Sequence, residues 1–83
     1  MWDAIQHTIR FVAQKLAKQL GKFLRQKRGN LTLLQFSKKL GISDSTLHRM
    51  EMGEQNVTLK TLEQLLKRLN CRIADVFGNF EVR

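Results

Sequence analysis

A chain of 83 residues is long enough for one domain with a modest core, because small domains bury a smaller share of their surface. Its single cysteine, Cys71, excludes an internal disulfide and a zinc site built from several cysteines. The net charge of +8 suits a polyanionic partner, and a solvated basic surface that only aids solubility is the alternative interpretation.

The positive charge is concentrated in the first half of the chain. Residues 4–43 contain nine basic and no acidic side chains, whereas residues 44–83 contain six of each. No segment has the roughly 20 apolar residues needed to span a bilayer, and the first residues lack the basic start and apolar run of a signal peptide. We therefore expect a cytoplasmic protein with no membrane partner.

Residues 2–28 are predicted to form a helix, because apolar residues recur there at steps of three and four. Gly21 weakens this helix by about 1 kcal/mol relative to alanine, so it is a candidate division between an amino-terminal arm and the first helix of the domain. We divide the chain into an arm, residues 1–14, a domain, residues 15–78, and a short tail, residues 79–83.

The arm is more apolar than a polar tail would be. Its apolar side chains are Trp2, Ile5, Ile9, Phe11 and Val12. Two interpretations stay open, because periodicity does not say which surface a stripe meets. The arm either folds onto the core of its own domain or forms a surface for a partner or a second copy.

Two short helical patterns follow, separated at Gly41. Gly29-Asn30 ends the first helix, and Thr32 with Gln35 forms a capping box that begins the next. Gly41 is suited to the left-handed conformation that ends a helix, and Ser43 can cap the helix after it. Two helices that cross over a turn of this length form a helix-turn-helix.

The second helix of this motif has two different faces. One face carries Leu47, Met50 and Glu51, which are spaced to pack together. The opposite face is short and mostly polar, with side chains that can form hydrogen bonds, and it suits the major groove of DNA. Its residues are Asp44, Ser45, His48, Arg49 and Met52.

Two further helices are predicted after a loop at residues 53–56. Thr58 caps the first of them, and five leucines give it an apolar stripe for the core. These are Leu59, Leu62, Leu65, Leu66 and Leu69. A short helix at residues 73–77 would close the core with Ile73, Val76 and Phe77. The alternating tail is a strand or a loose end, and we prefer the loose end for a single chain.

The order of these parts resembles the helix-turn-helix family of the phage repressors and Cro, across residues 16–78. The most specific portion runs from Leu31-Thr32 through Leu40-Gly41-Ile42-Ser43 to Leu47 and Gly53. The glycine at the turn, a small residue four before it and apolar residues six and nine after it fall at family spacing. The resemblance implies an all-α, compact five-helix lambda-repressor-like domain, here with an amino-terminal helical extension.

The resemblance also implies how DNA would be contacted, with the second helix of the motif in the major groove. The base-reading candidates are then Asp44, Ser45, His48 and Arg49. The phosphate-contacting candidates are Thr32, Lys38, Lys39, Gln55, Asn56 and Lys60. For Asp44 a second role stays open, because an acid in a first helical turn is stabilising by itself.

Three further expectations come from comparison with the family pattern. Arg25 would pair with Glu51 and orient the motif, if one extra residue is allowed at Gly29-Asn30. Leu33 and Leu34 stand where the family usually has polar residues, so the arm could cover a patch there. Arg72 is a poor cap for the last helix.

We therefore expect a sequence-specific regulator of transcription that binds double-stranded DNA, as a homodimer on a near-palindromic operator. The alternative is an antitoxin-like or other protein-interaction module that reuses the fold, with a protein partner at the arm. A membrane-surface helix at residues 2–28 is disfavoured, because its lysines are not confined to one face. The sequence shows no catalytic, cofactor or metal site, since His7 and His48 lie far apart and have no companion groups.

Overall fold

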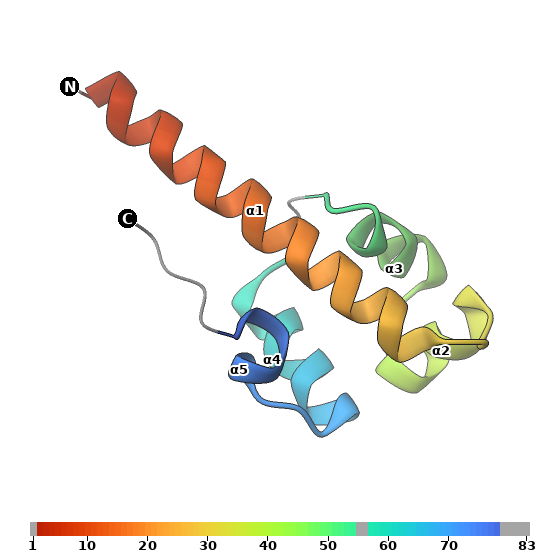
Figure 1. Cartoon of the computed structure of the whole chain (residues 1–83). Coiled ribbons are helices and arrows are strands. Elements are labelled where there is room, and N and C mark those ends of the chain that lie inside the picture. The colour runs from red at the N-terminus through yellow and green to blue at the C-terminus, as the bar shows by residue number, and fades with distance from the viewer. Residues whose placement is uncertain (1, 55–56, 79–83) are drawn as a thin grey trace.

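The computed structural model describes residues 2–54 and 57–78, with the side chains of the first helix described from Val12 onward. This part of the chain contains five helices and no strand, which confirms the all-α prediction. Figure 1 shows their arrangement. The helices are α1 (Trp2–Arg28), α2 (Leu33–Leu40), α3 (Asp44–Glu51), α4 (Leu59–Leu69) and α5 (Ile73–Phe77).

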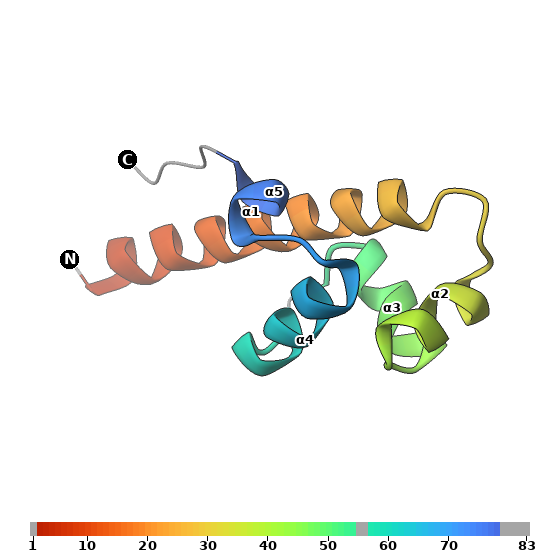
Figure 2. The same ribbon diagram turned by 90° about the horizontal axis from the view of Figure 1, so that it is seen from below.

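Helix α1 is continuous from Trp2 to Arg28, so Gly21 does not divide it as we had expected. At about 1.5 Å per residue this helix spans roughly 40 Å, and the molecule is 46 Å long. The predicted division after residue 14 falls inside α1. Figures 1 and 2 show the first turns of α1 projecting past the other helices, while α2 lies near the opposite end of α1.

The three predicted caps are confirmed at the starts of α2, α3 and α4. The side-chain oxygens of Thr32, Ser43 and Thr58 each accept a hydrogen bond from the backbone amide three residues later, at 3.1 Å. The amide of Thr32 in turn donates to the side chain of Gln35, which completes the capping box. Arg72 does not cap α5 with its side chain, but its backbone amide donates to Asp75 at 2.7 Å.

The core is formed where α1 meets the other four helices. Its buried residues come from every helix. They are Leu20, Leu24, Phe36, Leu40, Leu47, Met50, Leu65 and Val76. Around them pack partly buried residues that include Leu62, Leu66, Leu69 and Phe77.

Two residues that we expected in the core lie outside it. Leu59 is 84% exposed and Ile73 is 59% exposed. Each is the first residue of its helix, α4 or α5. Helical side chains point back towards the amino terminus, so at a first position they extend beyond the end of the helix rather than onto its packed face. The other leucines of α4, and Val76 and Phe77 of α5, pack in or against the core as predicted, but the first residue of each helix lies beyond it.

Cys71 follows α4 and is half-buried rather than fully buried, with its thiol donating to the carbonyl of Leu69 at 3.3 Å. The predicted alternatives for the tail, a strand or a loose end, concern residues outside the described part of the chain.

Candidate nucleic-acid interface

The turn between α2 and α3 is fixed by backbone conformation and by a side chain from α4. Gly41 is left-handed, with φ of 74°, as its position after α2 predicted. The amide nitrogen of Gln64 donates to the carbonyls of Leu40 and Gly41, at 2.9 and 3.1 Å. These two bonds occupy carbonyls at the end of α2 that the helix itself leaves free. The turn that leads into α3 is therefore fixed by the end of α2 and by the Gln64 side chain of α4.

One face of α3 is locked against α1. Leu47 is fully buried, and Met50 and Glu51 are almost so. Opposite them in α1 stands Gly21, where a Cβ atom would lie only 2.5 Å from the Met50 carbonyl oxygen. Only glycine fits at this position, because any side chain would force the two backbones apart. The glycine that appeared to weaken α1 thus allows α1 and α3 to approach closely.

Two arginines near the end of α1 form ion pairs with Glu51 at the end of α3: the Arg25 pair that we expected is present but long, and Arg28, which we did not expect, is the closer partner. The buried Glu51 carboxylate accepts three hydrogen bonds from the Arg28 guanidinium, at 2.9 to 3.2 Å. Arg25, the partner we expected, lies at 3.9 Å with a side chain that is 61% exposed. Arg28 also donates to the carbonyl of Leu31, so this one side chain ties together α1, the following turn and α3.

The opposite face of α3 is exposed to solvent. Asp44, Ser45, His48 and Arg49 are all exposed, as is Met52 directly after the helix. They belong to one short helix, so the structure brings together the four predicted base-reading residues. Within the described residues, the Arg49 guanidinium has no ion-pair or hydrogen-bond partner, so it is available to a ligand.

Asp44 differs from the other residues on this face. Its carboxylate accepts a hydrogen bond from the backbone amide of Ser45 at 2.9 Å. A negative charge at this position is also favoured by the positive end of the helix dipole. This geometry favours the helix-start role that the sequence left open beside base contact.

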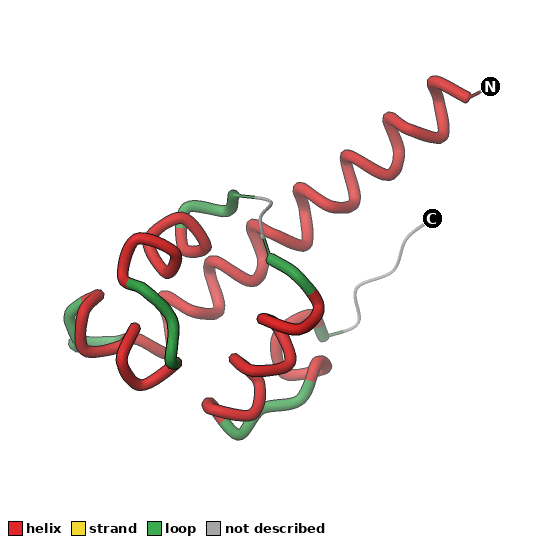
Figure 3. The backbone as a smooth tube through the Cα atoms, turned by 180° about the vertical axis from the view of Figure 1, so that it is seen from behind, coloured by secondary structure: helices red, strands yellow, loops and turns green. Residues whose placement is uncertain are grey.

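The structure describes four of the six predicted phosphate-contacting residues. Thr32, Lys38, Lys39 and Lys60 are exposed, on or next to α2 and α4. Gln55 and Asn56 lie outside the described residues. Figures 2 and 3 show α2, α3 and α4 on the same side of α1, so the exposed lysines belong to helices on the side of the molecule that carries the base-reading candidates.

The arm does not cover Leu33 and Leu34 within one chain, which corrects a further expectation. Leu33 packs at the edge of the core, whereas Leu34 is 53% exposed. The first turns of α1 and helix α2 lie at opposite ends of the molecule (Figures 1 and 2). Since α1 is a continuous rod, its beginning cannot reach α2.

Three basic residues of α1 were missed as site candidates. Lys18, Lys22 and Arg25 line a shallow hollow of about 200 Å³ at the end of α3, together with Met52 and Gly53. They are spaced by four and three residues, which places them on one face of a helix. This spacing could have identified them as a basic surface from the sequence alone. They extend the positive charge of α2 and α4 to the other end of α3.

Among the described residues, no group of three or more histidine, cysteine, aspartate or glutamate side chains could hold a metal ion. Of the helices described, none is long and apolar enough to cross a membrane.

Comparison with known proteins supports the same family as the sequence pattern. The chain matches the helix-turn-helix family over residues 22–76, which spans the last turns of α1, all of α2, α3 and α4, and most of α5. It is 40% identical over 57 residues to the plasmid copy control protein CopR of Streptococcus agalactiae. That alignment covers 68% of this chain and 62% of the relative. No solved structure was found to match.

Proposed function

Because this chain belongs to the helix-turn-helix DNA-binding family of the Cro and phage-repressor type, we propose that it regulates transcription by reading a specific DNA sequence. Helix α3 enters the major groove, and two copies bind the two halves of a near-palindromic operator. The name of the relative suggests plasmid copy control as the process.

The observation that carries the proposal is the division of α3 into a locked face and an exposed face. Glu51, Met50 and Leu47 hold the helix against α1 and the core. The outer face consequently has a fixed orientation without being covered by protein. A helix held in this way can present several side chains to base edges with little loss of conformational freedom on binding.

The side chains on the outer face suit base recognition. Arg49 can donate two hydrogen bonds to the O6 and N7 atoms of guanine, which is worth about 1–3 kcal/mol of discrimination against other bases. Ser45 and His48 add shorter hydrogen-bonding groups on the same face. Asp44 acts mainly at the helix start, because its carboxylate already accepts the Ser45 amide.

Contacts to the phosphates supply most of the affinity. We assign these contacts to exposed groups on the two helices that flank α3 in the sequence. They are Lys38 and Lys39 at the end of α2, Lys60 in α4, and the amino terminus of α2 at Thr32. Gln55 and Asn56 remain candidates from the family pattern. Each phosphate contact lowers the slope of log K against log salt by about 0.9, so these residues govern affinity for all sequences alike.

Two such domains are required for a near-palindromic operator. Two recognition helices in successive major grooves stand about 34 Å apart, and the two-fold symmetry of the protein is then matched by that of the DNA. A single α3 reads too few bases to select one site in a genome, so pairing is part of the proposed mechanism.

The division of roles is tested by binding measurements on a specific and a random duplex. Arg49→Ala should lower the ratio of specific to random affinity by about 5- to 150-fold, which corresponds to about 1–3 kcal/mol. Lys38→Ala should weaken binding to both duplexes and reduce the salt slope by about 1. Arg72→Ala, at an exposed arginine directly before α5 and outside α2, α3 and α4, serves as the matched control and should change neither quantity.

If Arg49→Ala and Lys38→Ala reduced affinity equally for the specific and random duplexes, the proposed reading role of Arg49 would be wrong. If the unaltered protein bound no duplex, the regulator proposal itself would fail. The second candidate, a protein-interaction module, would then gain support, and the observation that favours it is an exposed apolar groove remote from α3.

A further inference from the structure

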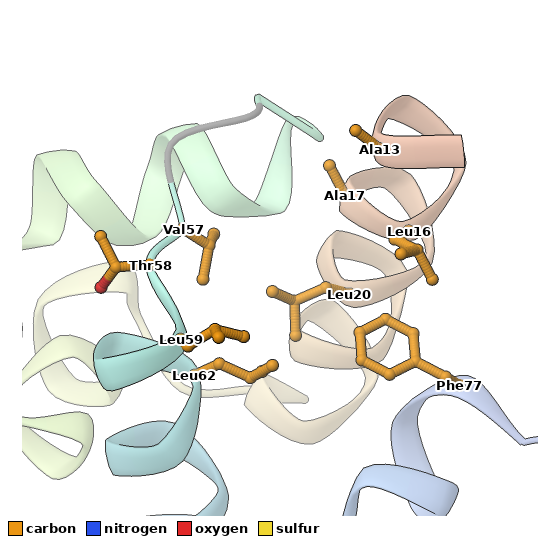
Figure 4. Close-up of a pocket in the computed structure, with 9 residues that line it drawn as sticks. All are labelled: Ala13, Leu16, Ala17, Leu20, Val57, Thr58, Leu59, Leu62 and Phe77. Atoms are coloured by element: carbon orange, nitrogen blue, oxygen red, sulfur yellow. The ribbon is translucent and has the colours of Figure 1, made fainter. Parts of the chain in front are cut away.

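An apolar groove runs between α1, the start of α4 and the end of α5. It encloses about 300 Å³. Figure 4 shows Leu20 of α1, Leu62 of α4 and Phe77 of α5 directed into the same space, with Leu59 beside them. Leu59 is 84% exposed even though it borders this hollow. A scattered exposed leucine is ordinary, but one at the rim of an apolar hollow marks a surface that a partner can cover.

The apolar stripe of α1 that lines this groove continues along the sequence towards the amino terminus. Leu16 and Leu20 line the groove, and the stripe extends from them at steps of three and four residues. Figures 1 and 2 show these first turns projecting beyond the rest of the molecule. In the described part of one chain, no other helix lies alongside them.

The charge of the arm indicates what covers the groove. Residues 1–14 contain one acid, Asp3, and one base, Arg10, so the arm has no net charge in a chain of +8. Two copies of so basic a protein repel each other over most of their surface. The arm and the groove form the segment where two copies can meet without this repulsion. An acidic partner would instead be drawn to the lysine-rich surfaces around α3.

We propose that this groove is the dimer interface: two copies pair through antiparallel α1 helices, and the arm of each copy fills the groove of the other. The proposal rests on the homodimer of the proposed function and names its surface. The arm and the groove are different, complementary patches of one chain. A two-fold axis places each arm in the partner's groove, so the dimer contains two identical arm–groove contacts and is closed.

The dimensions and positions of the residues agree with this arrangement. Ala13 and Ala17, four residues apart on the groove side of α1, leave room for the backbone of a second helix. A two-fold axis near Ala13 places residues 5–9 of one copy opposite residues 17–21 of the other. A stable interface buries about 800 Å² on each partner, and an aromatic side chain contributes about 150–250 Å² of this. The arm, with two aromatic and three aliphatic residues, has enough apolar side chains for such an area.

The interface leaves the DNA-binding face free. No residue of α3 lines the groove, so the outer face of α3 stays exposed when the groove is filled. Residues 79–83 follow α5 in the sequence and are the other candidate occupant from this chain. They contain only two apolar residues, Phe80 and Val82, which are too few for an area of this size.

The test is the mass of the full-length chain in solution without DNA, measured across a range of concentrations by sedimentation equilibrium. Leu59→Glu should weaken the dimer about 100-fold, because it replaces a buried leucine with a carboxylate in each of two symmetric contacts. An acid in the first turn of α4 favours the helix, so the fold should be retained. Leu34→Glu makes the same change in the first turn of α2, outside the groove, and should leave the dimer intact.

A second pair of variants tests the arm. Ile9→Glu should weaken the dimer as much as Leu59→Glu, whereas Gln14→Glu, the same change of charge at an exposed position on the opposite face of α1, should not. A monomeric unaltered protein would overturn the proposal. A dimer that Leu59→Glu and Ile9→Glu leave unchanged would place the interface elsewhere. Binding of the unaltered chain to duplex DNA is measured separately, so failure of this interface and failure of the regulator proposal can be told apart.

Discussion

Substitution of Gly21 by alanine gives opposite expectations from sequence and from structure. In an isolated helix, the change from glycine to alanine stabilises by about 1 kcal/mol. In the folded protein, the new Cβ atom would lie 2.5 Å from the Met50 carbonyl oxygen and 2.9 Å from that of Glu51. The Met50 carbonyl also accepts the amide of Gly53 at 3.0 Å, so it cannot turn aside without loss of that bond.

The size of the effect follows from these two terms. Overpacking by one methyl group in a well-packed core costs about 1–3 kcal/mol. The contact here is with backbone rather than with the end of a flexible side chain, so the cost lies at the upper part of this range. After the gain of about 1 kcal/mol in helix propensity is subtracted, Gly21→Ala should destabilise the fold by about 1–2 kcal/mol. For a domain of this length the melting temperature should fall by roughly 5–15 °C.

Thermal and urea unfolding followed by circular dichroism measure the effect. Gly29→Ala is the matched control. Gly29 has a left-handed backbone, with φ of 55°, but a Cβ atom there would meet no atom within 4 Å. This substitution should cost about 1 kcal/mol through left-handed strain alone. Because α3 must shift to admit the methyl group at Gly21, only Gly21→Ala should also weaken specific DNA binding. A rise in stability for Gly21→Ala would refute the close approach of α1 and α3.

Two further predictions concern single charged groups. Arg28→Ala should destabilise the fold by about 1–3 kcal/mol in urea unfolding, because it leaves the buried Glu51 carboxylate without its main partner. Arg25→Ala should change stability by less than about 0.5 kcal/mol, and equal effects would contradict the assignment of the pair to Arg28. Asp44→Asn should lower stability by about 0.3–1 kcal/mol and strengthen binding to specific and random duplexes alike. Loss of preference at one base pair would instead identify Asp44 as a base reader.

The features that could be predicted from the sequence are those set by neighbours along the chain. Thr32, Ser43 and Thr58 cap their helices as expected, since a cap needs only a hydroxyl and an amide three residues away. Gly41 adopts the left-handed conformation for a similarly local reason. Family membership followed from the same spacing, because the motif is short and its turn permits few alternatives.

The features that could not be predicted depend on how distant segments pack. Gly21 interrupts a helical pattern in sequence, and only the presence of α3 beside it reveals its use. Arg28 rather than Arg25 is the closer partner of Glu51. Which arginine is closer depends on where α1 ends relative to α3, and one extra residue in the turn at Gly29-Asn30 changes that position. For Leu59, the periodicity predicted that it lies on the apolar face of α4, but it did not predict that the core ends before this residue.

The base contacts of α3 were assigned by position in the family pattern, and the structure brings those residues to one exposed face. Which of them touches a base depends on the DNA, whose own shape and hydrogen-bonding groups complete the site. The central claim is therefore that the exposed face of α3 selects a sequence.

Selection of bound duplexes from a random pool at physiological salt tests this claim most directly. We predict an enriched inverted repeat whose half-site centres lie about 34 Å apart, with a guanine in each half-site that Arg49→Ala no longer selects. A bound pool without any enriched sequence would contradict the claim, because it would mean that the protein holds DNA only by its phosphates.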